Sequence, residues 1–242
     1  MNQQITLDII GYVSSPYKEK FAIPRQPGIV SAAKGSIELT GQANNIELVR
    51  GLEQFSHLWL MFIFHGTSAQ GWKPLVRPPR LGGNKKLGVL ATRSTFRPNP
   101  VGMSVVKLDD IRLDNKNVRL DISGLDLLDK TPVIDIKPYV PYSDALPDAS
   151  AGFAQEMPGN DLEVVFSNRA KADLAEASQA YPELEQLICQ VLAQDPRPAY
   201  KSGQADDKCY GMHLHQFNIQ WQMTGLTRAE VIAIENIARP AL

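Results

Sequence analysis

The sequence is poor in cysteine and has no long apolar run. Its 242 residues include two cysteines, Cys189 and Cys209, which are too few for the disulfide framework of a small secreted domain. The longest apolar run, residues 58–64, is far shorter than the roughly 20 residues that span a bilayer. Residues 1–13 have no basic segment followed by an apolar segment and a cleavage site. We therefore expect a cytoplasmic protein with free thiols.

Three common motifs are also absent: GxSxG of serine hydrolases, GxxxxGK[ST] of P-loop enzymes, and GxGxxG of Rossmann cofactor sites. The four histidines do not have zinc-like spacing. His57 and His65 would lie about 26 Å apart in one unbroken strand. His213 and His215 could share a face, but no third ligand is near them in sequence. We expect no metal.

Charge is unevenly distributed. Hydrophobic residues make up 43% and charged residues 21% of the chain, as in ordinary globular proteins. Residues 1–150 hold 18 basic and 14 acidic residues, whereas residues 151–242 hold 7 and 12. Residues 54–108, the acid-free stretch, contain eight basic residues and no acid. This stretch is either a surface for a polyanion or a set of solvated loops, and the absence of acids favours the polyanion.

The first 140 residues alternate between apolar and polar positions in short segments. This alternation predicts strands at residues 5–9, 36–39, 46–49, 87–91, 103–108 and 118–122. Turn-forming residues separate the segments, and most of them have no helical segment between them. The βαβ repeat of a doubly wound sheet is therefore missing, and a mainly β protein with an antiparallel β-barrel or sandwich fits better.

A linker is predicted at residues 142–160, which are rich in turn formers. It separates a first domain, residues 1–150, from a small α+β domain, residues 160–242. In the second domain, residues 162–166 resemble a strand and Asn168 can cap a helix to about residue 180. Helical spacing predicts a second, core-facing helix through five residues: Leu184, Leu187, Ile188, Val191 and Leu192. Further apolar segments follow at residues 209–223 and 231–237.

One stretch is rigid but irregular, namely residues 91–108. Pro98 and Pro100 restrict their own backbones and bias Arg97 and Asn99 toward extended conformations. Such a segment leaves backbone N–H and C=O groups outside a strand ladder, where they can bind the edge of a flat heterocycle such as adenine. A purely structural turn is the alternative.

A second dense stretch, residues 124–144, brings acids into the basic half of the chain. Its four acids are Asp126, Asp129, Asp135 and Asp144. From the residues alone, Asp129 is interpreted as a turn former and Asp135 as a paired charge.

At these motifs the sequence resembles the TsaA-like family, known as TrmO, of S-adenosylmethionine-dependent tRNA methyltransferases. The segments that carry the resemblance are YKEKFAIPRQPG (17–28), GLEQFSHLWLMFIFH (51–65), RPPRLGGNKKLGVLATRSTFRPNPVGMSVVKL (77–108) and GLDLLDKTPVIDIKPYVPYSD (124–144). DPRPAY (195–200) resembles the small C-terminal domain of the bacterial members. The resemblance implies a β-barrel methyltransferase outside the Rossmann and knotted classes, and a homodimer with the cofactor pocket near the subunit interface.

The resemblance also implies which residues bind S-adenosylmethionine: Pro24, Arg25, Gln26, His65, Gly66, Arg93, Met103, Asp129, Lys130, Thr131 and Pro132. The family often has glycine where Lys130 stands, so we expect a backbone contact there. Met103 stands where leucine is common, a change that keeps an apolar wall for the adenine ring.

The implied reaction is methylation of N6 of threonylcarbamoyl-adenosine at position 37 in threonine tRNA. That nitrogen is conjugated to the purine and to the carbamoyl group, so it is a poor nucleophile with an acidic N–H, and a nearby base would help. The sequence leaves His65, Asp135 and Tyr139 as alternatives for the base.

The basic residues expected to contact tRNA are Arg77, Arg80, Lys85, Lys86 and Arg97. One of Arg80, Arg93 and Arg97 is expected to pair with the threonyl carboxylate, because a planar guanidinium matches carboxylate geometry. Two other functions remain open, namely a non-enzymatic S-adenosylmethionine-binding regulatory barrel and an RNA-binding module. An acid-free stretch combined with a cofactor-site signature favours the enzyme.

Overall fold

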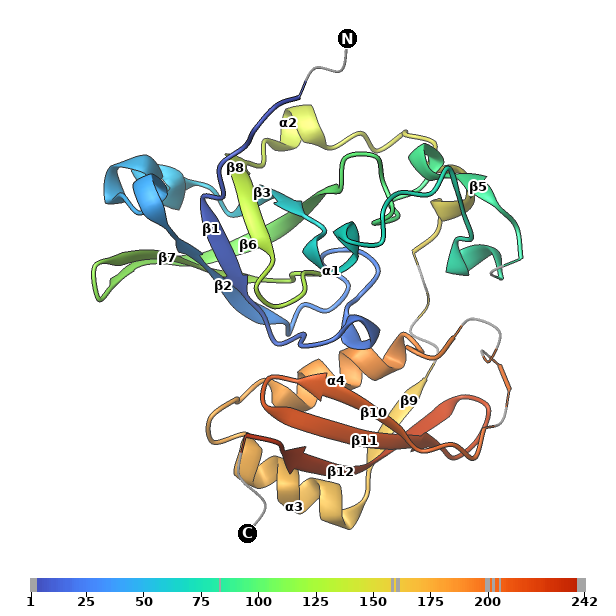
Figure 1. Ribbon diagram of the computed structural model, residues 1–242. Helices are drawn as coiled ribbons and strands as arrows, with labels where there is room; N and C mark the ends of the chain where they lie inside the picture. The colour runs from blue at the N-terminus through green and yellow to red at the C-terminus, as the bar shows by residue number, and fades with distance from the viewer. Residues whose placement is uncertain are drawn as a thin grey trace.

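The computed structural model describes residues 4–82, 84–157, 159, 162–198, 201, 203–204 and 206–238. It consists of two parts that lie one above the other in Figure 1. We call residues 10–144 the barrel unit and residues 162–238 the C-terminal unit. The predicted domain ranges, 1–150 and 160–242, and the DPRPAY motif at 195–200 each include residues outside the described ones.

Six strands form the main sheet of the barrel unit. They are β1 (Gly11–Ser14), β2 (Lys34–Leu39), β3 (His57–Ile63), β6 (Val101–Asp114), β7 (Asn117–Ser123) and β8 (Pro132–Pro138). The strand order is β1-β2-β7-β6-β3-β8, and β1 also pairs with β8, so that the sheet closes into a barrel. All pairings within this sheet are antiparallel.

Apolar side chains at alternate positions of the strands fill the inside of this closed sheet. Successive side chains of a strand point to opposite faces, and β3 buries Leu58, Leu60 and Phe62 while its other residues are more exposed. Leu120 and Ile122 of β7 are likewise fully buried. The core of the barrel unit therefore consists of one apolar face from each strand.

Short helices occupy the connections of the barrel unit. Four 3₁₀ helices precede β3, namely η1 (Lys20–Ala22), η2 (Gly41–Ala43), η3 (Ile46–Val49) and η4 (Leu52–Gln54). Two one-turn α-helices follow β3 and β8, namely α1 (His65–Ser68) and α2 (Pro141–Asp144). A last 3₁₀ helix, η7 (Gly152–Ala154), lies between the two units in sequence.

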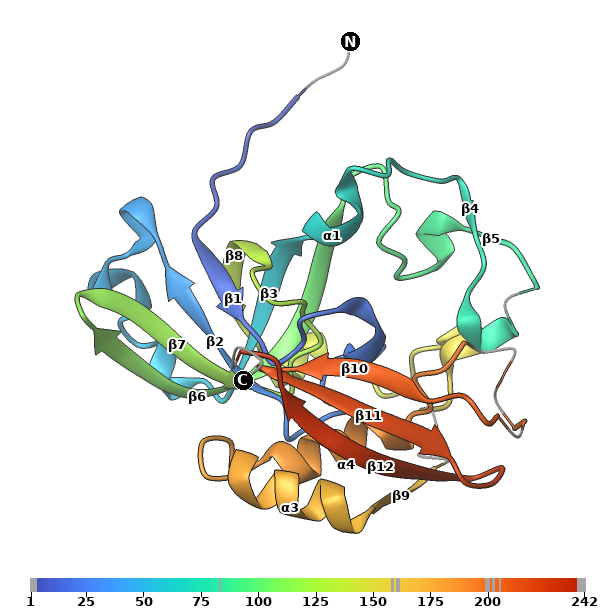
Figure 2. The ribbon, with the colours of Figure 1, turned by 60° about the horizontal axis from the view of Figure 1, so that its bottom comes forward.

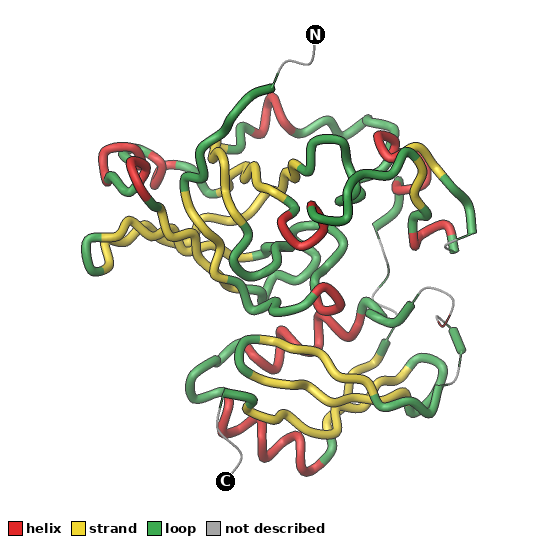
Figure 3. The backbone as a smooth tube through the Cα atoms, in the orientation of Figure 1, coloured by secondary structure: helices red, strands yellow, loops and turns green. Residues whose placement is uncertain are grey.

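A long connection from β3 to β6 forms what we call the arm, residues 69–100. It contains β4 (Leu75–Val76), β5 (Leu87–Gly88), η5 (Pro79–Leu81) and η6 (Val89–Ala91). Figure 2 shows the arm extending away from the barrel strands. Figure 3 shows that most of it is loop. The arm holds most of the basic residues of the acid-free stretch.

The C-terminal unit is a four-stranded sheet with two helices. Its elements are β9 (Glu163–Phe166), α3 (Asn168–Ala177), α4 (Leu184–Ala193), β10 (Tyr210–Leu214), β11 (Phe217–Met223) and β12 (Arg228–Asn236). The order is β10-β11-β12-β9, with β9 parallel to β12. Both helices lie on one side of the sheet (Figure 2). The five apolar residues predicted to face the core from α4 are all buried.

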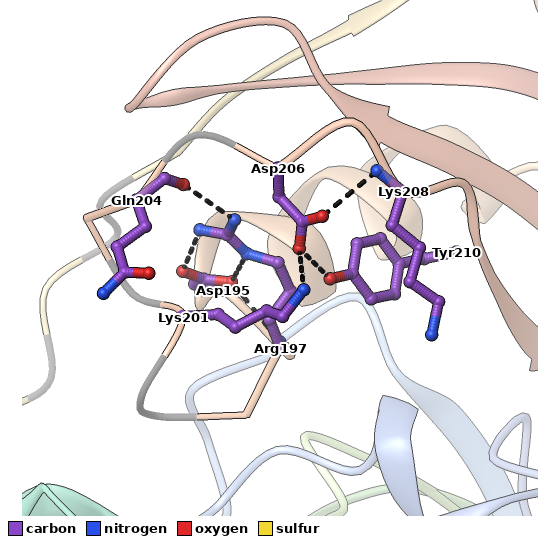
Figure 4. A network of polar contacts seen from close by, with 7 residues as sticks. All are labelled: Asp195, Arg197, Lys201, Gln204, Asp206, Lys208 and Tyr210. Atoms are coloured by element: carbon purple, nitrogen blue, oxygen red, sulfur yellow. Dashed lines mark hydrogen bonds and ion pairs between the residues drawn. The ribbon is translucent and has the colours of Figure 1, made fainter.

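A polar network fixes the loop between α4 and β10 (Figure 4). The Arg197 guanidinium is buried and donates from Nε and Nη2 to the two carboxylate oxygens of Asp195, at 2.7 and 2.8 Å. Its Nη1 also donates to the carbonyl of Gln204 at 3.2 Å. Beside this pair, the Asp206 carboxylate accepts hydrogen bonds from Lys201 and Tyr210.

The two units contact each other through backbone and side-chain hydrogen bonds. Ala32 N donates to Gln190 Oε1 of α4 at 2.9 Å. His215 N, in the turn after β10, donates to the carbonyl of Pro16 at 2.7 Å. An isolated antiparallel bridge joins Tyr17 to Leu214. The C-terminal unit is therefore bonded directly to the segment that follows β1.

The mainly β class is confirmed, and so are the strands predicted at 36–39, 103–108 and 118–122. The strand predicted at 5–9 is wrong, because this segment precedes β1 and leaves Ile5 and Leu7 exposed without a facing sheet. The strand predicted at 46–49 is the 3₁₀ helix η3. The Asn45 side chain accepts a hydrogen bond from Glu47 N at 3.0 Å and begins that helix.

Two further boundaries differ from the prediction. Only Leu87 and Gly88 of the predicted strand at 87–91 pair with β4, and the rest is η6. Helix α3 is capped by Ser167, whose hydroxyl accepts a hydrogen bond from Ala170 N at 3.1 Å, so that Asn168 is its first residue and not its cap. The helix ends at Ala177 instead of near residue 180.

Candidate functional site

A cavity of about 260 Å³ lies at one end of the barrel, between β3, α1, the arm and the turn before β8. Its walls are mostly apolar and its few polar groups converge from separate segments, which is typical of a small-molecule site. The lining residues are Lys20, Ile23, Phe62, Ile63, Phe64, His65, Gly66, Thr67, Thr95, Asp126, Leu127, Leu128 and Thr131.

Two aromatic rings form part of the apolar wall. Phe62 and Phe64 meet edge to face, with ring centroids 5.3 Å apart, a favourable geometry for aromatic pairs. Gly102 of β6 lies directly behind them, and a β-carbon there would come within 2.4 Å of the Phe62 ring. Glycine at this position therefore allows both rings to pack against the strand.

The side of the cavity formed by α1 contains two of the residues implied by the resemblance. His65 and Gly66 begin α1 directly after β3, and both line the cavity. The carbonyl of Gly66 accepts a hydrogen bond from Lys20 Nζ at 2.8 Å. This bond ties η1 to α1 across the cavity.

The turn at residues 128–132 is joined to the segment around β1. The two carboxylate oxygens of Asp129 accept a hydrogen bond from Ser15 N at 2.9 Å and pair with Lys18 Nζ at 2.7 Å. Lys130 has a left-handed backbone, with φ of 62°, and its N–H donates to the Val13 carbonyl at 2.8 Å. Thr131 is buried and lines the cavity. Asp129 is thus a turn residue, as interpreted from the sequence, and its carboxylate holds the turn in place.

Asp126 is a cavity residue that the sequence analysis named among four acids without giving it a role. Its Oδ1 is buried and has no hydrogen-bond partner among the described residues. Burial raises the pKa of its carboxyl group to about 6. A hydrogen bond with Ser104 and the charge of Arg93 lower this pKa by smaller amounts. The available signal was its position between two leucines, Leu125 and Leu127, which are fully buried.

Tyr17 carries a second buried polar atom without a partner among the described residues, its phenolic oxygen. Its side chain is fully buried, and burial together with the nearby charge of Asp126 raises the pKa of the phenol well above its usual value. Tyr17, which does not line the cavity, thus interacts electrostatically with Asp126, which does.

The first predicted cofactor segment lies close to the arm. Gln26 Oε1 accepts a hydrogen bond from Arg93 Nη1 at 2.5 Å, so two residues implied by the resemblance meet in the structure. Pro24 is buried and Arg25 is exposed. Pro132 begins β8 and pairs with Tyr12 of β1. None of these five side chains lines the cavity.

Met103 faces away from the cavity. It pairs with Met61 across β3 and β6, and 53% of its surface is exposed on the outer face of the barrel. Within one chain it therefore forms no wall of the cavity. A ligand that contacts Met103 would lie on the outer face of the barrel and not in this cavity.

Two of the three side chains considered for the base also lie outside the cavity. Asp135 of β8 pairs with Lys137 Nζ at 2.7 Å, which agrees with its interpretation as a paired charge. The ring of Tyr139 packs against Trp59, with centroids 5.8 Å apart. Of the three, only His65 lines the cavity.

The predicted RNA-contacting residues divide into two groups. Arg77, Arg80, Lys85 and Lys86 are exposed on the arm. Arg97 instead points back into the arm and donates to the carbonyls of Thr92 and Val89, at 2.7 and 3.4 Å. The arm therefore presents a basic surface, and Arg97 stabilises the loop that carries it.

A larger groove of about 950 Å³ lies between the two units. Its lining includes several cations, but these already have acidic partners nearby. Lys107 pairs with Asp109 at 2.9 Å, and Arg112 and Arg119 both pair with Asp121. The cavity at the barrel end, and not this groove, combines apolar walls with an unpartnered polar atom.

Within the described ranges, no three histidine, cysteine, aspartate or glutamate side chains lie together as a metal site would require. The same part of the chain contains no helix long and apolar enough to cross a membrane.

Comparison with protein families gives two matches that together cover most of the chain. The tRNA-methyltransferase O N-terminal domain matches residues 12–145. The TrmO C-terminal domain matches residues 159–237.

Curated relatives and solved structures agree with these matches. The chain is 52% identical to the tRNA (adenine(37)-N6)-methyltransferase of Escherichia coli K12, over 93% of this chain and 96% of that protein. A relative from Pseudomonas aeruginosa, 45% identical over 95% of this chain and 96% of its own, has the name of an S-adenosylmethionine-dependent methyltransferase. A crystal structure of TrmO from P. aeruginosa superposes with a TM-score of 0.81 and 38% identity, covering 98% of this chain and 99% of that one. Sequence and fold agree over nearly the whole length, and the chain belongs to the tRNA-methyltransferase O (TrmO) family.

Proposed function

We propose that this protein transfers a methyl group from S-adenosylmethionine to N6 of adenine 37 in tRNA. One observation carries the proposal. His65, Gly66 and Thr131, three of the residues implied to bind the cofactor, line one cavity, in a chain 52% identical to an enzyme with that name. The two predicted domain ranges, residues 1–150 and 160–242, belong to the same proposal.

The cavity has the chemistry that such a ligand requires. Phe62, Phe64 and Leu127 offer apolar surface to a flat ring, while Thr131 and Asp126 are polar residues of the same lining. When bound, S-adenosylmethionine supplies an electrophilic methyl group. The task of the protein is then mainly to hold the acceptor nitrogen in line and to exclude water. The turn at residues 128–132 is fixed by its bonds to Ser15 and Val13, and this suits it for that task.

The finer substrate follows from the resemblance and from the basic arm. We propose threonylcarbamoyl-adenosine in threonine tRNA as the substrate, with Arg93 pairing with the threonyl carboxylate. Arg80 and Arg97 already donate to backbone carbonyls. Arg93 is exposed, and within the described part of the chain its one hydrogen-bond acceptor is the Gln26 side chain. A tRNA substrate also supports a cytoplasmic location.

A homodimer belongs to the same proposal. Met103 is implied to contact the cofactor, yet it lies exposed on the outer face of the barrel, opposite Met61. A second copy packed on this face would bury the apolar surface and would place Met103 against the site of its partner. Sedimentation analysis of the wild type and of a Met103→Lys variant tests this, because a charge at the interface should give monomers.

Methyl transfer tests the function directly. Anticodon stem-loops of threonine tRNA, with and without the threonylcarbamoyl group, are incubated with S-adenosylmethionine labelled in its methyl group. We expect label on N6 of residue 37 in the modified RNA alone. Equal label in both RNAs would contradict the carboxylate contact. Cofactor binding without transfer would support a regulatory barrel, and RNA binding that ignores the cofactor would support a plain RNA-binding module.

A further inference from the structure

We infer that Asp126 is the general base of this site and takes the proton of the N6 amide-like nitrogen as the nitrogen is methylated. The inference rests on the proposed function and adds to it a residue outside the set implied by the resemblance. It starts from the placement of one carboxylate in the cavity.

Asp126 provides the one carboxylate among the described residues that line the cavity. It lies in the connection from β7 to β8, between Leu125 and Leu127, which are 0% and 1% exposed. Because both neighbours are anchored in the core, the backbone at Asp126 is fixed. Its Oδ1 is buried with no hydrogen-bond partner among the described residues. Buried polar atoms are rarely left in this state, so an unpartnered oxygen on a residue that lines a cavity indicates a role with a ligand.

The charged and titratable groups around Asp126 come from four segments. They are Tyr17 after β1, Lys20 of η1, His65 of α1 and Arg93 of the arm. Burial makes the carboxylate more basic than one in water, and its pKa of about 6 leaves it ionised at neutral pH. A base is most effective when its pKa lies close to the working pH. The environment of Asp126 meets this condition.

The step balances with groups already named. The nitrogen lone pair forms the new N–CH₃ bond while the bond from methyl to sulfur breaks, and the electron pair of that bond stays on sulfur. The N–H proton passes to the carboxylate of Asp126, which becomes neutral. The positive charge of the sulfonium is lost together with the negative charge of the carboxylate, so the step removes both of these charges. Release of the proton to water after product leaves restores the base.

The test uses Asp126→Asn in the full chain, since asparagine keeps the shape and removes the basic oxygen. We expect kcat on the modified stem-loop to fall at least 100-fold. The Kd for S-adenosylmethionine, measured by calorimetry, should stay within about threefold. In the wild type, log kcat should rise with pH and level off near pH 6, and the variant should lack this limb. Asp114→Asn makes the same chemical change at the exposed end of β6 and should keep the activity within about twofold.

Each other outcome overturns the inference. If Asp126→Asn retains kcat within threefold, the proposed function stands and Asp126 is not the base. If its Kd for S-adenosylmethionine weakens more than tenfold while kcat at saturation is kept, Asp126 is a cofactor ligand. If His65→Gln and not Asp126→Asn removes the acid limb, His65 is the base. If the wild type binds the cofactor but methylates neither stem-loop, the proposed function fails, and the inference fails with it. A thermal melt of each variant shows whether it is folded.

Discussion

At the scale of single residues, the cavity and the turn beside it keep groups that the fold would be more stable without. Asp126 holds a buried oxygen without a partner, and Lys130 holds a left-handed backbone that favours glycine. Residues that lower stability while lying at a site are commonly retained for function. Both positions therefore give stability predictions that are independent of any assay of methyl transfer.

Asp126→Asn should stabilise the folded protein at neutral and alkaline pH. The folded pKa of about 6 lies above the reference value of 3.8, so the unfolded chain loses its proton first. Folding stability then falls as pH rises from about 4 to 6 and stays reduced above it, by about 3 kcal/mol at 1.36 kcal/mol per pKa unit. Urea unfolding should show the variant to be more stable at pH 8 and equal to wild type at pH 4. Lower stability of the variant at pH 8 would contradict this.

Lys130→Gly should stabilise the protein by about 0.5–1 kcal/mol, because glycine adopts a φ of 62° without the steric cost of a β-carbon. Lys130→Ala is the matched control, since it removes the charge and keeps the β-carbon. It should give no gain. If the cofactor is contacted through the backbone here, both variants should bind S-adenosylmethionine like the wild type. Equal gains from glycine and alanine would show that the charge, and not φ, is the cause.

At the scale of elements, the sequence predicted what depends on local pattern. The stripe of α4 and the alternation of β2, β6 and β7 reflect one buried face each, and those elements are where the sequence predicted them. Residues 46–49 alternate equally well, but the Asn45 cap and the following i+3 bonds make them a 3₁₀ helix. Residues 5–9 alternate without a sheet to face. Pattern thus predicts a half-buried element only where a tertiary partner exists.

The loop from α4 to β10 should depend on its buried ion pair. Arg197→Met leaves the Asp195 carboxylate without its two guanidinium donors, and we expect a loss of about 3–5 kcal/mol in urea unfolding. The double variant Asp195→Asn with Arg197→Met removes the stranded charge, and asparagine suits the left-handed φ of 47° at residue 195. It should recover at least half of that loss. A single variant that loses less than about 1 kcal/mol would show that water replaces the guanidinium.

At the scale of the whole molecule, the site is assembled from segments that are distant in sequence. Phe62, Thr95 and Asp126 meet only because the sheet closes and the arm folds back on it. The resemblance of the sequence to the TrmO family implied three of the residues that line the cavity, namely His65, Gly66 and Thr131. The unpartnered state of Asp126 could not be predicted, because it depends on which side chains surround it after folding. The outward direction of Met103 depends in the same way on the register of β3 and β6.

Burial of one histidine, His215 in the turn after β10, should make stability sensitive to acid. The ring of His215 stacks on Tyr181, with centroids 4.1 Å apart, and burial lowers its pKa to about 4, with Lys18 adding to the effect. The unfolded chain takes up this proton near pH 6.5, so stability is lost as pH falls from about 6.5 to 4, by about 2 kcal/mol after allowing for partial exposure. His215→Asn tolerates the φ of 53° and should flatten this dependence. An unchanged slope would assign it to other groups.

Binding of tRNA should weaken with salt because of the arm. Each phosphate contact contributes about 0.7–0.9 to the slope of log K against log salt. Replacing Arg77 and Lys85 by alanine should therefore reduce the slope by about 1.5. Lys171→Ala, on the exposed surface of α3, should leave the slope unchanged. Equal slopes in all variants would place the RNA elsewhere.

Closure of the barrel also sets the order of events during synthesis. Gly11 pairs with Leu39 on one side and with Val133 on the other, so the first strand is completed only by the last one. A nascent chain released as far as β7 has β1 with one open edge and no cavity. Contacts between residues so distant in sequence form slowly, because a long loop must be ordered first. Folding rates should therefore respond more to changes in the β1–β8 pairing than to changes in the β6–β7 hairpin, and the cavity should be the last part of the barrel to form.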